Sequence, residues 1–185
     1  DVYRSYFQRM GNEELRVFRG KDWAILESEK LQEFGERLTF VAQETQEGYG
    51  HAVYQAKDFV GDDPFLLMLG DHIYISADNG GRNCARQLID KYQASGLEVM
   101  TGVQMTPGNL LHLFGTLKCE LLDPVHGYYR VDQIMEKPSE DYAAAHLRTN
   151  GLPPGSYLCH FGMHVFPSTI FDALAHHIAN NIREK

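Results

Sequence analysis

The stretch Phe65-Leu66-Leu67-Met68-Leu69-Gly70-Asp71-His72 is the strongest indication of the fold of this chain. Five large apolar residues follow one another without alternation, which predicts a strand buried on both faces, as in parallel sheets. In open α/β sheets such strands deliver their carboxyl ends to a ligand crevice. We therefore expect Asp71 to present its carboxylate at a binding site.

A second signal lies upstream, in the turn Gly48-Tyr49-Gly50-His51. This turn directly precedes a stretch that we predict as a helix, from about His51 to Asp58. Glycine allows close approach to the backbone, and the N–H groups at a helix start favour an anion or a base. Together with Asp71, the turn indicates a nucleotide site with a metal ligand.

Strand and helix signals alternate through the first half of the chain. Apolar periodicity predicts helices at about residues 2–10, 22–34 and 82–94. Strands are predicted at residues 38–42, 65–69 and 97–105. Helices of this length between strands imply right-handed crossovers, so we predict an α/β sandwich with a mostly parallel central sheet.

The second half of the chain has a different pattern. Extended stretches at residues 114–122 and 128–135 flank the turn formers of residues 123–127, which predicts an additional antiparallel hairpin. We expect a helix at residues 140–148 after the N-cap Ser139, a strand at 157–166 and a final helix at 168–181.

Composition narrows the class of protein. With 185 residues and 43% hydrophobic residues, the chain can bury one sizeable core, so we expect a single domain over residues 1–185. A net charge of -8 argues against a nucleic-acid binder. No apolar run reaches membrane-spanning length and the start resembles no signal peptide, so we expect no membrane contact and a cytoplasmic location. Three widely spaced cysteines fit reduced, mostly buried thiols.

Several motifs follow in a set order: Phe40-Val41-Ala42-Gln43, Gly48-Tyr49-Gly50-His51-Ala52-Val53, Leu69-Gly70-Asp71, Phe114-Gly115, Ile134-Met135-Glu136-Lys137-Pro138 and Phe161-Gly162. This series resembles the sugar-phosphate nucleotidyltransferases, most closely the bacterial UTP:glucose-1-phosphate uridylyltransferases. The resemblance extends from about Leu38 to the end of the chain. It implies a Rossmann-like nucleotidyltransferase sandwich.

The same resemblance implies a reaction. A nucleoside triphosphate, most directly UTP, would transfer its nucleotidyl group to a sugar 1-phosphate such as glucose 1-phosphate, giving a nucleotide sugar and pyrophosphate. Such chemistry asks the protein to position two anions and neutralise their charge, for which Mg²⁺ is suited. An amide both donates and accepts hydrogen bonds, so Gln43 does not by itself exclude a purine base.

Site residues also follow from the resemblance. It implies two catalytic residues, Asp71 as the Mg²⁺ ligand and Lys137 as a compact charge against phosphate. The residues that it implies as substrate contacts are Gln43 at the pyrimidine edge, Glu136 at sugar hydroxyls, and Gly48, Gly50, Gly70, His72, Gly115 and Gly162 around the nucleotide and sugar.

Each assignment has a structural alternative. Asp71 also fits a turn or a helix cap, Gly48 and Gly50 fit ordinary turns, and Gly115 and Gly162 fit strand bulges. His72 is either a contact beside the metal or phosphate or a structural histidine. The nine histidines show no zinc-site spacing.

Enzymes of this kind open with a strand and a Gly-rich basic loop that wraps the triphosphate, and nothing before Leu38 matches it. We therefore expect the chain to be an internal fragment, without that strand, that loop and the closing segment. Such a fragment would be inactive alone and would favour self-association as a homo-oligomer. A non-catalytic sugar-nucleotide-binding or assembly module derived from such an enzyme stays open as an alternative.

Overall fold

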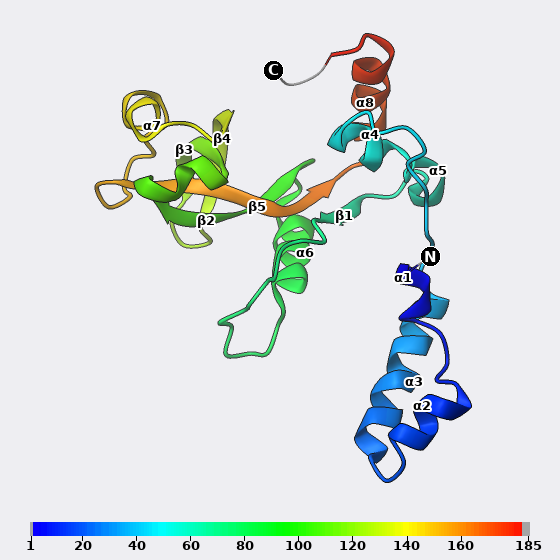
Figure 1. The fold of residues 1–185 in the computed structure, drawn as a ribbon. Coiled ribbons are helices and arrows are strands. Elements are labelled where there is room, and N and C mark those ends of the chain that lie inside the picture. The colour runs from blue at the N-terminus through cyan, green and yellow to red at the C-terminus, as the bar shows by residue number, and fades with distance from the viewer. Residues whose placement is uncertain (1, 183–185) are drawn as a thin grey trace. The chain divides into compact units, whose positions relative to one another are not determined.

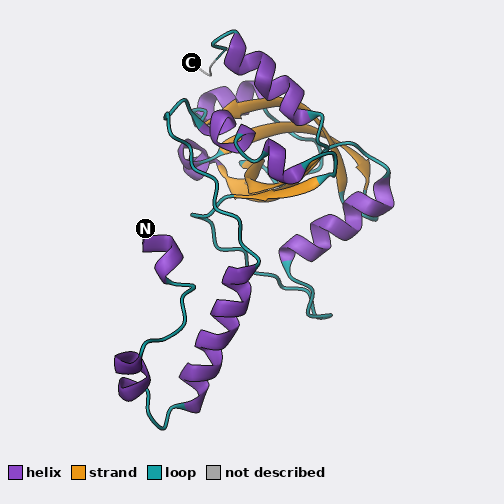
Figure 2. Ribbon diagram, turned by 90° about the vertical axis from the view of Figure 1, so that its right-hand side faces the viewer, coloured by secondary structure: helices purple, strands orange, loops and turns teal. Residues whose placement is uncertain are grey.

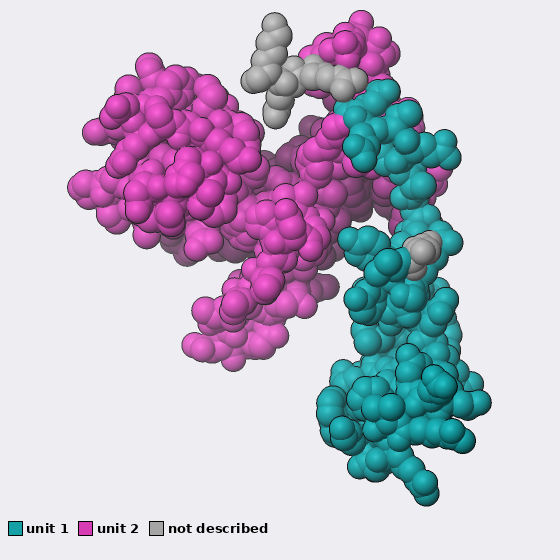
Figure 3. Space-filling model, in the orientation of Figure 1, with its two compact units in different colours: residues 1–47 teal, residues 48–185 magenta. Residues whose placement is uncertain are grey.

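The computed structural model describes residues 2–182 and divides the chain into two compact units, residues 1–47 and residues 48–185 (Figure 3). Unit 1 contains α1 (Val2–Ser5), α2 (Asn12–Val17) and α3 (Asp22–Glu36), followed by an irregular segment. Unit 2 contains the sheet and the remaining helices (Figure 1). Within the described residues, no helix combines the length and apolarity that crossing a bilayer requires.

Aromatic packing holds the start of unit 1 to its end. The Phe7 ring lies 5.9 Å from the Phe34 ring and 6.2 Å from the Phe40 ring, measured between centroids. The predicted helix at 22–34 is confirmed by α3, whereas the one at 2–10 shortens to α1. The strand predicted at 38–42 is wrong, because these residues join no ladder that would satisfy their backbone groups, and ring contacts hold Phe40 instead.

Unit 2 is built on a five-stranded sheet (Figures 1 and 2). Its strands are β1 (Phe65–Met68), β2 (Met100–Pro107), β3 (Gly115–Asp123), β4 (Tyr128–Glu136) and β5 (Ser156–Phe166). The order is β1-β5-β3-β4, and β2 also pairs with β5. The α/β class is confirmed and so is the β3–β4 hairpin, which pairs Gly115 with Glu136.

The predicted mostly parallel sheet is wrong, because all four strand pairings among the described residues are antiparallel. The helices that separate the strands suggested crossovers between parallel neighbours. Instead, β1, β2 and β3 each pair with the distant strand β5 and run opposite to it. β1 is only half-buried, and Met68 is exposed. The prediction that this strand is buried on both faces is therefore wrong.

The helices of unit 2 begin and end where local chemistry allows. α6 (Cys84–Ser95) starts at Asn83, whose side chain accepts a hydrogen bond from the N–H of Arg86, and ends at the left-handed Gly96. α7 (Glu140–His146) is capped by Ser139 as predicted, and α8 (Ile170–Ala179) follows β5. The helix predicted at 51–58 is split into α4 (Tyr49–Tyr54) and α5 (Lys57–Val60). The 3-10 helix η1 (Gly108–Leu113) was not predicted.

β5 contributes to all three apolar clusters of unit 2. Leu158 packs with β3, Cys159 packs with η1 and α7, and Met163 and Val165 pack with α6. On the opposite face Phe166 lies against Phe65, whose ring stacks on Phe171 of α8 with centroids 5.2 Å apart. The cysteines are free thiols and two of them are buried, which confirms the prediction for the described residues.

Gly162 interrupts β5 with a φ of +72°, and a Cβ on it would lie 2.5 Å from Cγ of Leu69. Gly155 has nearly the same φ, +73°, but open space around it. We expect Gly155→Ala to cost about 1 kcal/mol of unfolding free energy for backbone strain alone. Gly162→Ala should cost about 1–3 kcal/mol more, because its methyl group overlaps Leu69. Urea denaturation of both variants measures the difference, and equal losses would contradict a close approach of Leu69 to Gly162.

Candidate functional site

A junction between strands lies on one edge of β5. β2 pairs with residues 156–165 along the opposite edge of β5, so β1 and β3 share the edge on which the junction lies. β1 runs toward this point and ends at Met68, which pairs with Met163, and β3 begins nearby, with Thr116 paired to Cys159. We call this place, opposite residues 160–162 of β5, the strand junction.

The strand junction gathers most of the predicted site residues. Gly70 and Asp71 follow the end of β1, and Gly115 begins β3. β4 runs back along β3, so its carboxyl end at Glu136 pairs with Gly115, and Lys137 comes next. Gly162 lies on β5 itself, where its carbonyl accepts a hydrogen bond from the N–H of Leu69 at 2.9 Å.

Gly115 is required at its position. A Cβ there would overlap Nε2 of His160 and would lie 2.9 Å from Oε2 of Glu136. The Glu136 side chain is half-exposed, and its Oε1 lies 3.6 Å from Nζ of Lys137. Two charged groups of opposite sign are therefore presented to solvent beside a backbone that carries no side chain.

Lys137 has an unusual backbone. Its φ of +45° lies in the left-handed region, which non-glycine residues rarely adopt. Its N–H donates to the carbonyl of Phe114 at 3.2 Å, which holds the turn in place directly before Pro138. Strain of this kind is concentrated at functional sites.

Asp71 is exposed and its local partner is His72. Oδ1 of Asp71 lies 2.9 Å from Nδ1 of His72, and this hydrogen bond lowers the pKa of Asp71. The His72 ring stacks on Tyr74, whose hydroxyl donates to the carbonyl of Gly162 at 2.7 Å. His72 thus links Asp71 to β5 through Tyr74, and its contact with a substrate stays a prediction.

The donor set suits a metal that takes few protein ligands. The described residues contain no group of three or more His, Cys, Asp or Glu side chains arranged for a metal ion. A single exposed carboxylate such as Asp71 is the kind of ligand that a hard divalent cation takes together with phosphate oxygens and water.

The two glycines of the turn at residues 48–51 have different surroundings. Gly48 has a φ of +101° and open space around it at the start of α4. Gly50 faces α8 instead, because a Cβ on it would lie 3.1 Å from Cδ2 of Leu174. Tyr49 lies within electrostatic range of Tyr74, and burial together with Tyr74 raises its pKa. Gln43 lies in the irregular segment of unit 1, so its contact with a base stays a prediction, as does any substrate contact of Gly50.

Sequence reasoning missed two histidines of β5, His160 and His164. Their rings lie 5.7 Å apart, and Nδ1 of His164 is 2.8 Å from Oγ1 of Thr101. Burial and the neighbouring His160 lower the pKa of His164 to about 4. Both histidines interrupt an otherwise apolar strand, which is the pattern that could have singled them out.

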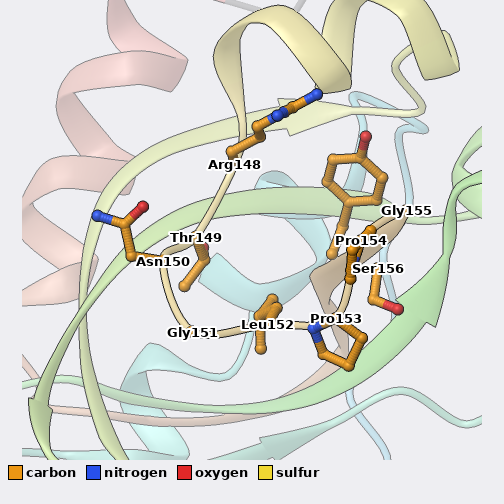
Figure 4. A pocket seen from close by; sticks show the side chains of 10 residues that line it. Arg148, Thr149, Asn150, Gly151, Leu152, Pro153, Pro154, Gly155 and Ser156 are labelled. Carbon is orange, nitrogen blue, oxygen red and sulfur yellow. The ribbon is translucent and has the colours of Figure 1, made fainter.

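The cavity shown in Figure 4 lies apart from the predicted site residues. It has a volume of about 270 Å³ and is lined by residues 148–157, none of which was predicted as a site residue. Thr149 of this loop accepts a hydrogen bond from the N–H of Cys119 at 3.0 Å. The loop therefore braces β3.

Comparisons with known proteins confirm the family resemblance. A family model described as nucleotidyl transferase matches residues 16–185. UTP–glucose-1-phosphate uridylyltransferase 2 of Staphylococcus saprophyticus is 32% identical over 154 residues, covering 82% of this chain and 46% of the relative. The Bacillus subtilis UTP–glucose-1-phosphate uridylyltransferase is 34% identical over 117 residues, covering 62% of this chain and 37% of the relative. This chain thus spans less than half the length of these curated relatives.

Solved structures share the fold. A crystal structure of apo-UDP-glucose pyrophosphorylase matches with a TM-score of 0.72 and 22% identity, covering 95% of this chain and 58% of that one. A second, complexed with UDP-glucose, matches with a TM-score of 0.67 and 20% identity over 94% of this chain and 57% of that one. The α/β architecture of such pyrophosphorylases is therefore the architecture of this chain, with the antiparallel pairings described above.

The lowered pKa of His164 predicts a pH dependence of stability. Between pH 6.5, the ordinary histidine value, and about 4, the unfolded chain binds the proton that the folded chain excludes. The unfolding free energy contributed by this group is therefore complete above pH 6.5 and is lost as the pH falls toward 4. We expect His164→Phe to flatten this slope in denaturation curves measured across that range. The exposed His112→Phe serves as the control, and an unchanged slope in the His164 variant would contradict the assignment.

Proposed function

Because the chain belongs to the nucleotidyl transferase family, we propose that it transfers a uridylyl group from UTP to glucose 1-phosphate, giving UDP-glucose and pyrophosphate. The observation that carries this proposal is the strand junction, where the carboxyl ends of β1 and β4 bring Asp71, Glu136 and Lys137 beside a backbone of glycines. The names of the curated relatives and a similar structure that contains UDP-glucose support the choice of substrates. The comparisons do not favour a non-catalytic module.

In this proposal, residues 1–185 count as one nucleotidyltransferase domain. The family match spans residues 16–185 and so includes parts of both units. Gln43 of unit 1 supplies the amide that reads the uracil edge. A Cβ on Gly48 or Gly70 would meet no atom within 4 Å, and the absence of a side chain there lets a nucleotide approach the backbone closely.

The reaction forms one phosphorus–oxygen bond and breaks another. An oxygen of the sugar phosphate attacks the α-phosphorus of UTP, and the bond from that phosphorus to the bridging oxygen breaks, so that pyrophosphate leaves with the electron pair. The protein holds the two phosphates in line and offsets their charge. Asp71 would hold Mg²⁺, which supplies positive charge to the triphosphate.

The remaining residues hold the sugar phosphate. The Glu136 carboxylate accepts hydrogen bonds from sugar hydroxyls, and Lys137 meets the phosphate as a point charge. Gly115 and Gly162 keep the sheet surface beside them free of side chains. His72 orients the Asp71 carboxylate through its hydrogen bond.

Asp71→Asn tests the metal ligand, in the full-length protein if the 185-residue chain is inactive alone as the sequence predicts. The change keeps the size of the side chain and removes its charge, so turnover should fall on the order of 100-fold or more. Asp123→Asn is a matched control, because Asp123 is a hairpin carboxylate that pairs with His126 at 2.7 Å in the same way. Pyrophosphate release measures turnover, and EDTA should abolish it in the unmodified protein. Turnover that survives Asp71→Asn at saturating Mg²⁺ would remove Asp71 from the site.

Glu136 and Lys137 should differ in kinetics. Glu136→Gln should chiefly raise KM for glucose 1-phosphate, because its contacts with hydroxyls are similar in substrate and transition state. Lys137→Ala should chiefly lower kcat, about 10- to 100-fold, because its charge meets phosphate where negative charge is redistributed. Initial rates at varied glucose 1-phosphate separate the two effects. Identical changes in both constants would refute the division of roles.

A further inference from the structure

His160 lies in one lateral row with Gly115 and Glu136. The register pairs Gly115 with Glu136 on one side, and the neighbouring pair Thr116–Cys159 places His160 opposite Gly115 on the other. Side chains of one row point to the same face of a sheet. Because Gly115 has no side chain, Nε2 of His160 and Oε2 of Glu136 border the same space.

The ring of His160 is incompletely satisfied. Its Nδ1 is buried and has no hydrogen-bond partner among the described residues. A buried N–H without an acceptor costs more than an unshared lone pair, so the tautomer with its proton on Nε2 is favoured. Nε2–H is then a donor directed toward the space that it shares with the Glu136 carboxylate.

We propose that His160 is a further substrate-binding residue, whose Nε2–H donates to a hydroxyl of the sugar that donates in turn to Glu136. A hydroxyl can donate and accept at once, whereas a carboxylate only accepts and this ring nitrogen only donates. One sugar hydroxyl therefore satisfies both groups. This role rests on the proposed function. His160 and Glu136 together would then recognise the configuration of the sugar at that hydroxyl.

The pair of ligands UDP and UDP-glucose isolates the contribution of the sugar. Calorimetric titration of the protein should show tighter binding of UDP-glucose than of UDP. His160→Val should lower the affinity for UDP-glucose about tenfold, because one hydrogen bond to the sugar is lost, and leave the affinity for UDP unchanged. His160→Gln should recover part of the loss, because its amide nitrogen reaches the position of Nε2. His112→Val, at an exposed histidine of η1, should change neither affinity.

Thermal unfolding of the same variants separates binding from folding. Removing a buried nitrogen that has no partner should leave the melting temperature of His160→Val unchanged or raise it. A lower melting temperature together with weaker binding of both ligands would show a structural residue and overturn the proposal. If the unmodified protein prefers UDP-glucose and His160→Val binds UDP-glucose with the same affinity, the role of His160 alone is overturned. No preference in the unmodified protein would overturn both this role and the proposed function.

Discussion

Antiparallel pairing along β5 is the constraint on which unit 2 depends. A strand has two edges, and the eleven residues of β5 serve three partners, so β1 and β3 must divide one edge between them. The division creates the strand junction, and the antiparallel pairings fix the directions of the strands. Because β1 approaches the junction and β3 leaves it, the hairpin partner β4 returns there with its carboxyl end. Asp71, which follows β1, and Glu136, which ends β4, are 65 positions apart in the sequence, but both come at the ends of strands that run toward the junction.

Glycines shape the candidate site as much as its side chains do. Gly115 admits the ring of His160, and Gly162 admits Leu69, each at a distance that a Cβ would forbid. The same region contains a left-handed Lys137 and an unpaired ring nitrogen of His160. Such features reduce stability, and packing of the surrounding core offsets them. Their concentration around one row of the sheet distinguishes this row from the rest of the surface.

Local chemistry alone does not identify the functional carboxylate. Asp71 and Asp123 both pair with a nearby histidine, and in both the hydrogen bond to that histidine lowers the pKa. Asp123 closes the tip of the β3–β4 hairpin, where Val125 and His126 donate backbone hydrogen bonds to it. Asp71 follows β1 at the strand junction. The difference between the two residues is therefore their place in the sheet and not their immediate partners.

The sequence by itself determined several local elements and the order of the motifs. Some features depend only on neighbours within a few positions and can therefore be predicted from the sequence. They are the cap at Ser139, the helix end at Gly96, the hairpin around residues 123–127 and the apolar run before Asp71. Only the tertiary structure decided the direction of the sheet, the absence of a strand at residues 38–42 and the position of His160 beside Glu136. An apolar run predicts that a strand forms, but its partner, direction and register arise from pairings between distant segments. Those pairings are set by how the core packs as a whole, which periodicity in one segment does not record.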